Sequence, residues 1–585
     1  MTNIAPLPVV VPLVGAAAVL FAHLIVPRRV VQAFAMAAVL AEICLAAVLI
    51  HQVRSTSIVY WFGGWTPRGA VALGISFTVD QIGAGAALLA GVVSAAAVAV
   101  APSTMRDPDG IVYALFLTLL AAMAGFCLTG DLFNMFVFFE LMAVSAFALS
   151  AYDTRSPDAL RGALNFAITN SIGAFLVLIG IALLYSSTGA LNLAQIGHQL
   201  ARTGLDNAST VALSLLLAGF LIKAAVIPFH FWLIDTATTA PTPLVMILAG
   251  VLDTLGVYGV ARVYWTVFAS PLAADHRAVQ FMLVAVGAIS ALVAGTLSIL
   301  FSDPRRRMAF VMVAHTGIVL IGVACLSARG VAGAAIYAVG DGTVKAALFI
   351  GLALIGFETA HGQRQDHDVA GSPSRTAGLA VLIVGGLATA GLPLFATGLG
   401  KASIEKAAAV AGFPWAVVAI VFAAAVTGGA VLNIASTARR ATGPRRDEHA
   451  CAWVPQLLVA SILFGISALT TKVGTWAATA AGRFSDTLAY QQRVLSGAAT
   501  SPAGIATRYA TTFPWIVLDL LSVAAAIVLG SGLAQNTARR LSPSPMRSGI
   551  WTAIRRVHDG SIGDSATWVT LGTAGIALVL ATTMH

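Results

Sequence analysis

Apolar segments of about 20 residues, separated by short polar segments, follow one another along almost the whole chain. A helix of about 20 apolar residues crosses the roughly 30 Å of hydrocarbon in a bilayer. Backbone groups in hydrocarbon must also find their hydrogen bonds within the spanning segment, which favours helices. The pattern predicts sixteen membrane-spanning helices, near residues 7–26, 31–51, 80–102, 112–130, 132–151, 163–186, 210–231, 243–264, 278–301, 308–327, 332–356, 377–411, 414–437, 452–470, 513–534 and 566–583. We therefore expect an all-α polytopic membrane protein.

Prolines interrupt two of these segments, Pro228 in the seventh and Pro393 in the twelfth. Proline removes a backbone donor and breaks or kinks a helix. Broken helices at matching places in two consecutive blocks are typical of transporters built from inverted repeats. The pattern predicts two inverted five-helix repeats among these helices. The expected divisions are 1–106 (helices 1–3), 107–267 and 268–437 (the repeats), 438–471 (helix 14), 472–512 (a connector along the membrane surface) and 513–585 (C-terminal helices).

Composition agrees with a location in the membrane, since 58% of residues are hydrophobic and 10% are charged, against about a quarter charged in soluble domains. The net charge of +9 does not indicate nucleic-acid binding, because no loop gathers basic residues with interleaved aromatics. Basic loop residues are instead more frequent after odd-numbered helices, which predicts that both termini lie outside. The four cysteines are scattered, without the spacing of a metal site or a disulfide framework.

Three of the five lysines lie inside apolar segments: Lys223, Lys345 and Lys401. A lysine at the bilayer centre costs about 2.5 to 3.5 kcal/mol on insertion scales, so each needs a partner or a hydrated cavity. Residues four apart share a helix face, and this spacing pairs Lys345 with Asp341 and Lys401 with Glu405. The alternative for each lysine is that its ammonium group snorkels toward the membrane surface.

Lys223 has no acid on its own helix face, and Glu140 has no base on its face. We infer that Glu140 and Lys223 pair between the fifth and seventh helices. Burial makes the proton affinity of a lysine sensitive to a neighbouring carboxylate, and moving or neutralising that carboxylate changes it. The pair therefore suits proton transfer. A static ion pair that fixes the helix register is the alternative.

Two histidines extend the set of candidates. His315 lies in an apolar segment, and histidine titrates near neutrality, so it would relay protons between Lys223 and Lys401. A structural, hydrogen-bonded histidine fits the same position. His230 follows Pro228, where it would load protons or cap the broken helix.

Further acids lie within apolar segments. Asp253 lies near the middle of the chain and is expected to join the relay, whereas Glu42 and Asp519 are expected to pair structurally or to lie nearer the interface. No nicotinamide, flavin or cluster motif accompanies them. The sequence therefore predicts no catalytic, cofactor-binding or metal-binding residue.

Several segments, in this order, resemble the proton-conducting antiporter family. This family includes antiporter-like subunits of respiratory complex I and of membrane-bound hydrogenases, and subunits of Mrp-type sodium/proton antiporters. The segments, between about residues 76 and 437, are LTGDLFNMFVFFELM, which is most similar to the D-type subunit of Mrp antiporters, LIKAAVIPFHFWLIDTATTAPTP, DPRRRMAF…AHTGIVLIG, DGTVKAALF and GLPLFATGLGK. The resemblance implies that Glu140 is the fifth-helix carboxylate, Lys223 the broken-helix lysine, His315 a central-axis histidine and Lys401 the terminal lysine of the twelfth helix. It also implies a core of about fourteen helices, with about two extra C-terminal helices outside it.

Two positions depart from the family pattern. Family members commonly carry a lysine or histidine in the eighth helix before Gly-x-Tyr, where this chain has Thr254 beside Asp253. The eleventh helix often has a histidine four residues before its lysine, where this chain has Asp341 before Lys345. These departures put the middle of the relay in question.

The function that the resemblance implies is a proton-translocating subunit of a multisubunit Na⁺/H⁺ antiporter, not itself an enzyme. It would lie in the bilayer of a bacterial cell (inner) membrane with other membrane subunits, and would move protons and Na⁺. One alternative is a proton-pumping subunit of a complex I-like or hydrogenase complex, with any redox chemistry in partner chains. The others are a transport-inactive scaffold and a membrane enzyme, for which HGQRQDHD at 361–368 is the candidate site.

Overall fold

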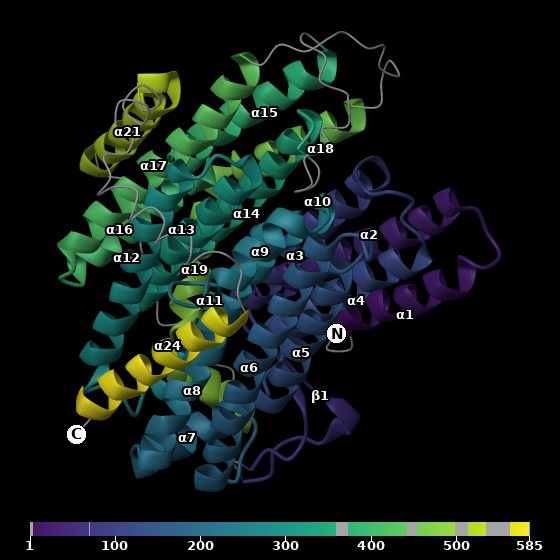
Figure 1. The fold of residues 1–585 in the computed structure, drawn as a ribbon. Helices are drawn as coiled ribbons and strands as arrows, with labels where there is room; N and C mark the ends of the chain where they lie inside the picture. Colours follow the sequence, from purple (N-terminus) through teal and green to yellow (C-terminus); the bar gives the residue numbers. More distant parts are fainter. Residues whose placement is uncertain are drawn as a thin grey trace.

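The computed structural model describes residues 4–69, 71–357, 372–440, 453–497, 513–533 and 562–583, and most of them are helical. Twelve helices in these ranges are long and apolar enough to cross a membrane. Shorter apolar helices accompany them: α1 (Leu7–Ala22), α8 (Asn207–Lys223) and α18 (Val454–Ser467). The helices pack side by side into one bundle (Figure 1). The prediction of an all-α polytopic membrane protein is confirmed.

The chain begins with three helices and a small hairpin. They are α1, α2 (Arg28–Gln52), β1 (Ile58–Trp61), η2 (Phe62–Gly64), β2 (Ser76–Val79) and α3 (Gln81–Thr104). The strands are antiparallel, with Ile58 opposite Val79. This hairpin leads directly into α3, whose first turn is capped by the Asp80 carboxylate accepting from Gly83 N.

Two blocks of five helical segments follow. The first contains α4 (Gly110–Leu128), α5 (Leu132–Ser150), α6 (Pro157–Thr188), the pair α8 and α9 (Phe231–Thr239), and a continuous helix made of α10 (Thr242–Ile247), η3 (Leu248–Leu252), α11 (Asp253–Val263) and η4 (Tyr264–Phe268). The second contains α12 (His276–Leu300), α13 (Pro304–Ala324), α14 (Ala328–Leu354), the pair α15 (Pro373–Thr389) and α16 (Ala396–Val410), and α17 (Pro414–Arg440). The short helix α7 (Leu193–Thr203) joins α6 to α8. The fourth segment of each block is broken.

The first break separates α8 from α9, and Pro228 lies inside it. Side chains satisfy backbone groups that the break frees. The indole Nε1 of Trp232 donates to the carbonyl of Ile222 at 3.0 Å, and the hydroxyl of Ser290 accepts from the backbone N–H of Ile227 at 3.0 Å. Irregular backbone at membrane depth is tolerated when protein groups cover it in this way.

The second break separates α15 from α16, and Pro393 lies inside it. The apolar segment 377–411 is therefore two helices. Here the Thr397 hydroxyl donates to the carbonyl of Ala388 at 2.7 Å. Both breaks are thus held by a side-chain donor on the far side that reaches a backbone carbonyl on the near side.

Glycines allow the two blocks to approach closely. A Cβ on Gly342 of α14 would lie 2.1 Å from the carbonyl oxygen of Gly250 in η3, so neither residue tolerates a side chain without a shift. Small residues let membrane helices pack backbone to backbone. This contact brings the start of α11 beside the middle of α14.

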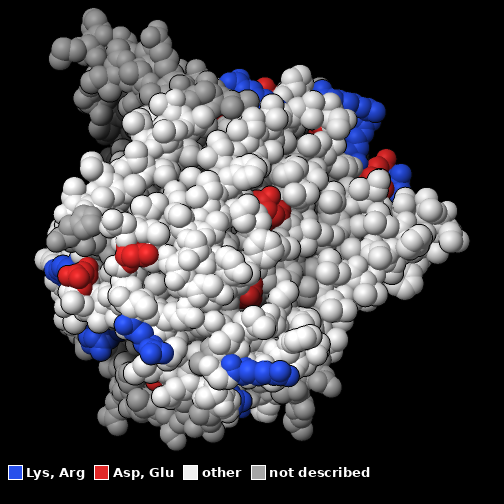
Figure 2. Space-filling model, turned by 90° about the horizontal axis from the view of Figure 1, so that it is seen from below, with Lys and Arg blue, Asp and Glu red and all other residues white. Residues whose placement is uncertain are grey.

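The last part of the chain wraps onto this core. It contains α18, α19 (Thr470–Phe484), α20 (Thr487–Ser496), α21 (Phe513–Val528) with η5 (Leu529–Leu533), and α24 (Ile562–Thr583). Helix α21 packs against α17, and α24, yellow in Figure 1, packs against α8. The face in Figure 2 carries few charged groups, separated by uncharged surface.

The first part of the connector expected over 472–512 is a packed helix. Helix α19 packs against α3, α14 and α16, and Ala477, Ala480, Ala481 and Phe484 are buried along one of its faces. The sequence does not reveal this buried face, because an alanine-rich helix shows little contrast between apolar and polar positions. Residues 498–512 lie outside the described residues.

Candidate functional site

Ionisable side chains that are buried in the bundle, or half-buried in the case of Glu140, form three sets. We call them the Lys223 group (Glu140 and Lys223), the Lys345 cluster (Asp253, His315, Asp341 and Lys345) and the Lys401 cluster (Lys401, Glu405 and Asp519). The first lies at the α8–α9 break, the second where α11, α13 and α14 meet, and the third on α16 and α21.

In the Lys223 group the two charges are neighbours without a hydrogen bond. Lys223 ends α8 and is fully buried. Its ammonium lies 4.7 Å from the ring centroid of Phe139, a cation–π contact. Among the described residues, neither its Nζ nor Oε1 of Glu140 has a hydrogen-bond partner, although the two groups interact electrostatically. Within the described residues, the pair inferred from the sequence therefore makes no direct contact, and the Phe139 ring lies against the ammonium.

The Lys345 cluster is a closely packed charged network. Lys345 Nζ lies 2.8 Å from Asp341 Oδ2 and 3.2 Å from Asp253 Oδ2. Asp341 Oδ1 lies 2.5 Å from Nδ1 of His315. With one ammonium and two carboxylates, the cluster carries one excess negative charge when His315 is neutral. A proton on His315 balances it.

Polar side chains surround both ring nitrogens of His315. The Thr427 hydroxyl donates to the carbonyl of Ala423 at 2.7 Å, so its oxygen accepts from His315 Nε2 at 2.9 Å. Nδ1 faces the Asp341 carboxylate, which accepts only. The phenol of Tyr337 lies 3.1 Å from the same nitrogen. Both ring nitrogens of His315 therefore lie beside hydrogen-bonding oxygens.

The sequence analysis did not single out Thr316, Tyr337 or Thr427. Tyr337 lies four residues before Asp341, so helical spacing marks it. The Thr316 hydroxyl donates to Asp253 Oδ2 at 2.9 Å, and Thr316 follows His315 in the chain. Thr427 lies on α17, and no helical spacing in the sequence connects it with His315.

The Lys401 cluster combines a predicted pair with an acid from the C-terminal region. Lys401 Nζ lies 3.0 Å from Glu405 Oε1 and 2.7 Å from Asp519 Oδ1. All three side chains are buried. Because Asp519 is 118 residues away in sequence, no periodicity connects it with Lys401.

The remaining candidates lie nearby or apart. Thr254 donates to Asp253 Oδ1 at 3.1 Å. His230 precedes α9, with its ring centroid 4.2 Å from that of Phe231, and makes no capping hydrogen bond to that helix. Glu42 lies in α2 against Gly91, and its carboxylate oxygens have no hydrogen-bond partner within the described ranges, so the structural pairing expected for it is absent there.

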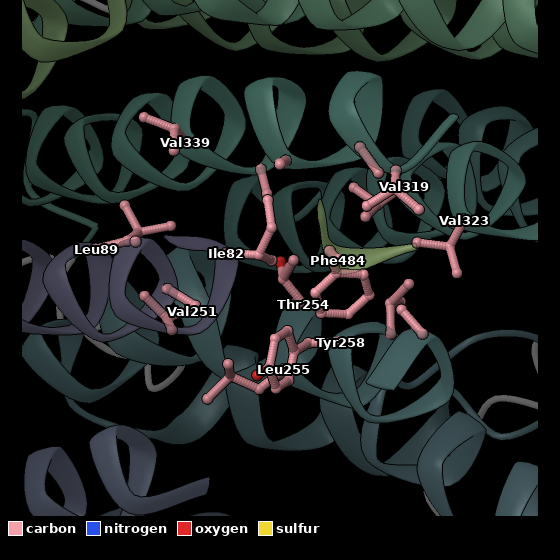
Figure 3. Close-up of a pocket in the computed structure, with 18 of the residues that line it drawn as sticks. Ile82, Leu89, Val251, Thr254, Leu255, Tyr258, Val319, Val323, Val339 and Phe484 are labelled. Atoms are coloured by element: carbon pink, nitrogen blue, oxygen red, sulfur yellow. The ribbon is translucent and has the colours of Figure 1, made fainter. Parts of the chain in front are cut away.

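An apolar cavity of about 90 Å³ adjoins the Lys345 cluster (Figure 3). Ile82, Leu89, Val339 and Phe484 contribute to its wall, and Thr254 connects it to Asp253. An apolar cavity holds water poorly. The sequence analysis did not predict this space.

Tyr258, one helical turn after Thr254, links the cavity wall to an ion pair. The phenol of Tyr258 accepts from Arg262 Nη2 at 2.6 Å, and Arg262 pairs with Asp80 at 2.5 Å. In the part of the chain that the structure describes, no group of three or more His, Cys, Asp or Glu residues is arranged to hold a metal ion. The segment 361–368, named above for an enzyme site, lies outside the described residues.

Comparison with known proteins gives consistent results. A family model described as "NADH:quinone oxidoreductase/Mrp antiporter, TM" matches residues 129–427. The chain is 31% identical over 372 residues to NADH-quinone oxidoreductase subunit N of Desulforudis audaxviator, covering 62% of this chain and 72% of that protein. It is 28% identical over 358 residues to the Na(+)/H(+) antiporter D-type subunit of Bacillus subtilis, covering 60% and 69%.

Solved structures show the same architecture. A chain of the membrane-bound sulfane sulfur reductase, an archaeal respiratory membrane complex, superposes with a TM-score of 0.74 at 26% identity, covering 84% of this chain and 99% of that chain. A chain of the Mrp complex from Dietzia sp. DQ12-45-1b superposes with a TM-score of 0.71 at 23% identity, covering 85% and 100%, which is evidence for the fold. The family match includes Lys223, Lys345 and Lys401 but ends before Asp519.

Proposed function

Because the chain belongs to the NADH:quinone oxidoreductase/Mrp antiporter transmembrane family, we propose that it is the proton-translocating subunit of a multisubunit antiporter that exchanges protons for a monovalent cation, Na⁺. It works with other membrane subunits in a bacterial cell membrane. The observation that carries this proposal is the Lys345 cluster, in which four ionisable side chains from three helices are hydrogen-bonded or ion-paired without contact with solvent.

Stability alone does not explain such a cluster. Burying charged groups costs several kcal/mol per ion, and well-packed apolar residues of similar volume are often as stable. Intramembrane ionisable residues are characteristic of ion and proton pathways. We assign the accepting and releasing group of the Lys345 cluster to His315, because Lys345 keeps both carboxylate partners whether or not the imidazole carries the proton.

The Lys223 group supplies a lysine whose proton affinity can change. Its ammonium has no hydrogen-bonded counter-ion among the described residues and depends on the field of Glu140. It also ends the helix next to a break. A small displacement of α5 or α8 would therefore change how strongly Lys223 holds its proton. We assign proton exchange to Lys223, to the Lys345 cluster and to the Lys401 cluster.

The experiment that tests the proposal is proton movement in vesicles that contain the assembled complex, followed with a pH-sensitive dye after addition of Na⁺. Lys223→Ala, Glu140→Ala and Lys401→Ala are each expected to lower the rate by about a hundredfold, the range of a lost proton-transfer group. Lys406→Ala is the matched control, because Lys406 is not fully buried and has no ion pair in the described ranges. Unchanged proton movement in all three variants would reject the proposal and favour a transport-inactive scaffold.

A second candidate is a proton-pumping subunit of a redox-driven complex. It is favoured by the 31% identity to subunit N of an NADH-quinone oxidoreductase and by the similarity to a chain of a respiratory sulfane sulfur reductase. The same vesicles distinguish the two. Proton movement that requires an electron donor and ignores a Na⁺ gradient would assign the chain to such a complex.

A further inference from the structure

We propose that Asp519 on α21 is a proton-transfer residue of the Lys401 cluster, so that the C-terminal region completes the terminal lysine site. The inference rests on the proposed function and assigns a role to a helix that lies beyond the family match, which ends at residue 427.

The first observation is the position of the carboxylate. Asp519 Oδ1 is nearer to the ammonium of Lys401, at 2.7 Å, than Glu405 Oε1 is, at 3.0 Å. The same oxygen lies 3.6 Å from the position of a Cβ built on Gly391, a residue within the α15–α16 break. Asp519 therefore meets Lys401 where the helix backbone is open, and not at the lipid surface.

The second observation is the packing face of α21. Its buried side chains are Asp519, Ser522, Val523 and Ala526, at the i, i+3, i+4 and i+7 spacing of one helix face. Val523 and Ala526 form an apolar cluster with Ala390 at the end of α15. Asp519 thus occupies a position where an apolar residue would complete the seam, and an acid at membrane depth is costly without a functional partner.

The third observation is a comparison with α24, which covers the other break. A Cβ on Gly572 of α24 would lie 2.6 Å from the ring of Phe229, and the Trp568 ring stacks on Phe231. The described side chains of α24, at residues 565–582, include no charged one. The contacts that α24 makes with the first break through Trp568 and Gly572 are therefore apolar, whereas α21 places an acid at the second break beside Lys401.

Two carboxylates around one ammonium allow a proton to cross the cluster. When Glu405 holds the proton, Lys401 remains paired with Asp519, and when Asp519 holds it, Lys401 remains paired with Glu405. The proton enters on one carboxylate and leaves from the other, and no bond other than O–H and N–H bonds changes. A fourth titratable group, the phenol of Tyr337 on α14, interacts electrostatically with both acids.

The test compares Asp519→Asn and Asp519→Glu with Lys401→Ala in the vesicle assay described above. Asp519→Asn is expected to slow proton movement by about a hundredfold and to move the pH optimum to lower pH, since Lys401 keeps one counter-charge instead of two. Asp519→Glu is expected to keep most of the rate. Ser522→Ala, which removes a buried hydroxyl from the same face of α21, is the matched control and leaves both rate and optimum unchanged.

The outcomes separate the inference from the proposed function. If Lys401→Ala stops proton movement while Asp519→Asn keeps the wild-type rate and pH optimum, the inference is overturned and the function stands. If neither variant changes proton movement, both fail. A measurement on the wild type covers the case in which Asp519→Asn does not assemble: a hydrophobic carbodiimide, which modifies protonated carboxyl groups, should label Asp519 in a pH-dependent way. Absence of that adduct at every pH overturns the inference.

Discussion

Replacing Lys345 with methionine tests whether the Lys345 cluster is an electrostatically balanced unit. The lysine lies within 3.2 Å of Asp253 and 2.8 Å of Asp341, and all three side chains are buried. Methionine has a similar volume, so packing changes little, but two carboxylates then share a site with the single possible positive charge of His315. One negative charge is left without a partner.

Breaking a buried ion pair by removing one partner costs about 3 to 5 kcal/mol. This is about two to three and a half orders of magnitude in a folding equilibrium. Adding Asp253→Asn to Lys345→Met restores the original balance, because Asp341 and protonated His315 then neutralise each other. We therefore expect the single variant to melt at a clearly lower temperature in detergent, and the double variant to recover most of the loss. Both are expected to lack proton movement in vesicles.

Lys406→Met is the matched control, since it makes the same change at a lysine without an ion pair in the described part of the chain. Its melting temperature should stay close to that of the wild type. The reasoning is refuted if Lys345→Met melts like the control, or if Asp253→Asn adds a second loss of stability instead of offsetting the first.

Two further predictions concern packing and capping. Gly342→Ala should lower the free energy of unfolding by about 1 to 3 kcal/mol, because its Cβ would lie 2.1 Å from the carbonyl of Gly250, whereas Gly465→Ala, with nothing within 4 Å, should be neutral or stabilising in the same thermal melts. Asp206 caps α8 and accepts from the hydroxyl and the backbone N–H of Ser209, which lowers its pKa from the ordinary value of 3.8. A carboxyl group whose pKa is lowered on folding stabilises the fold above its ordinary pKa, and this stabilisation is lost as the pH falls through the pKa of the folded state. Asp206→Ala should therefore lower the free energy of unfolding by about 1 kcal/mol at neutral pH and not at all in strong acid. An equal loss in acid would contradict this.

The contacts that the sequence predicts lie within single helices. Lys345 with Asp341 and Lys401 with Glu405 follow from a spacing of four residues, and both pairs are present as ion pairs. Apolar segment length likewise predicts the membrane helices. These features depend on the geometry of one helix, which is the same in every protein.

The contacts that the sequence does not predict lie between helices. The partnership of Lys345 with Asp253 depends on the close approach of Gly342 to Gly250, and side-chain spacing carries no information about that approach. The sequence also predicts that Glu140 and Lys223 pair between helices. It does not predict that the Phe139 ring lies against the ammonium, because that contact again depends on how the helices pack.

The order of the Lys401 cluster along the chain has a consequence for biogenesis. Lys401 and Glu405 enter the membrane well before Asp519, which is 118 residues downstream of the lysine, and synthesis proceeds from the N-terminus. A nascent or truncated polypeptide that stops before residue 513 would contain the lysine and one acid but not the other. The Lys401 cluster would then be the last of the three sets to become complete. An unfinished subunit would therefore lack one of its proposed proton-exchange sites.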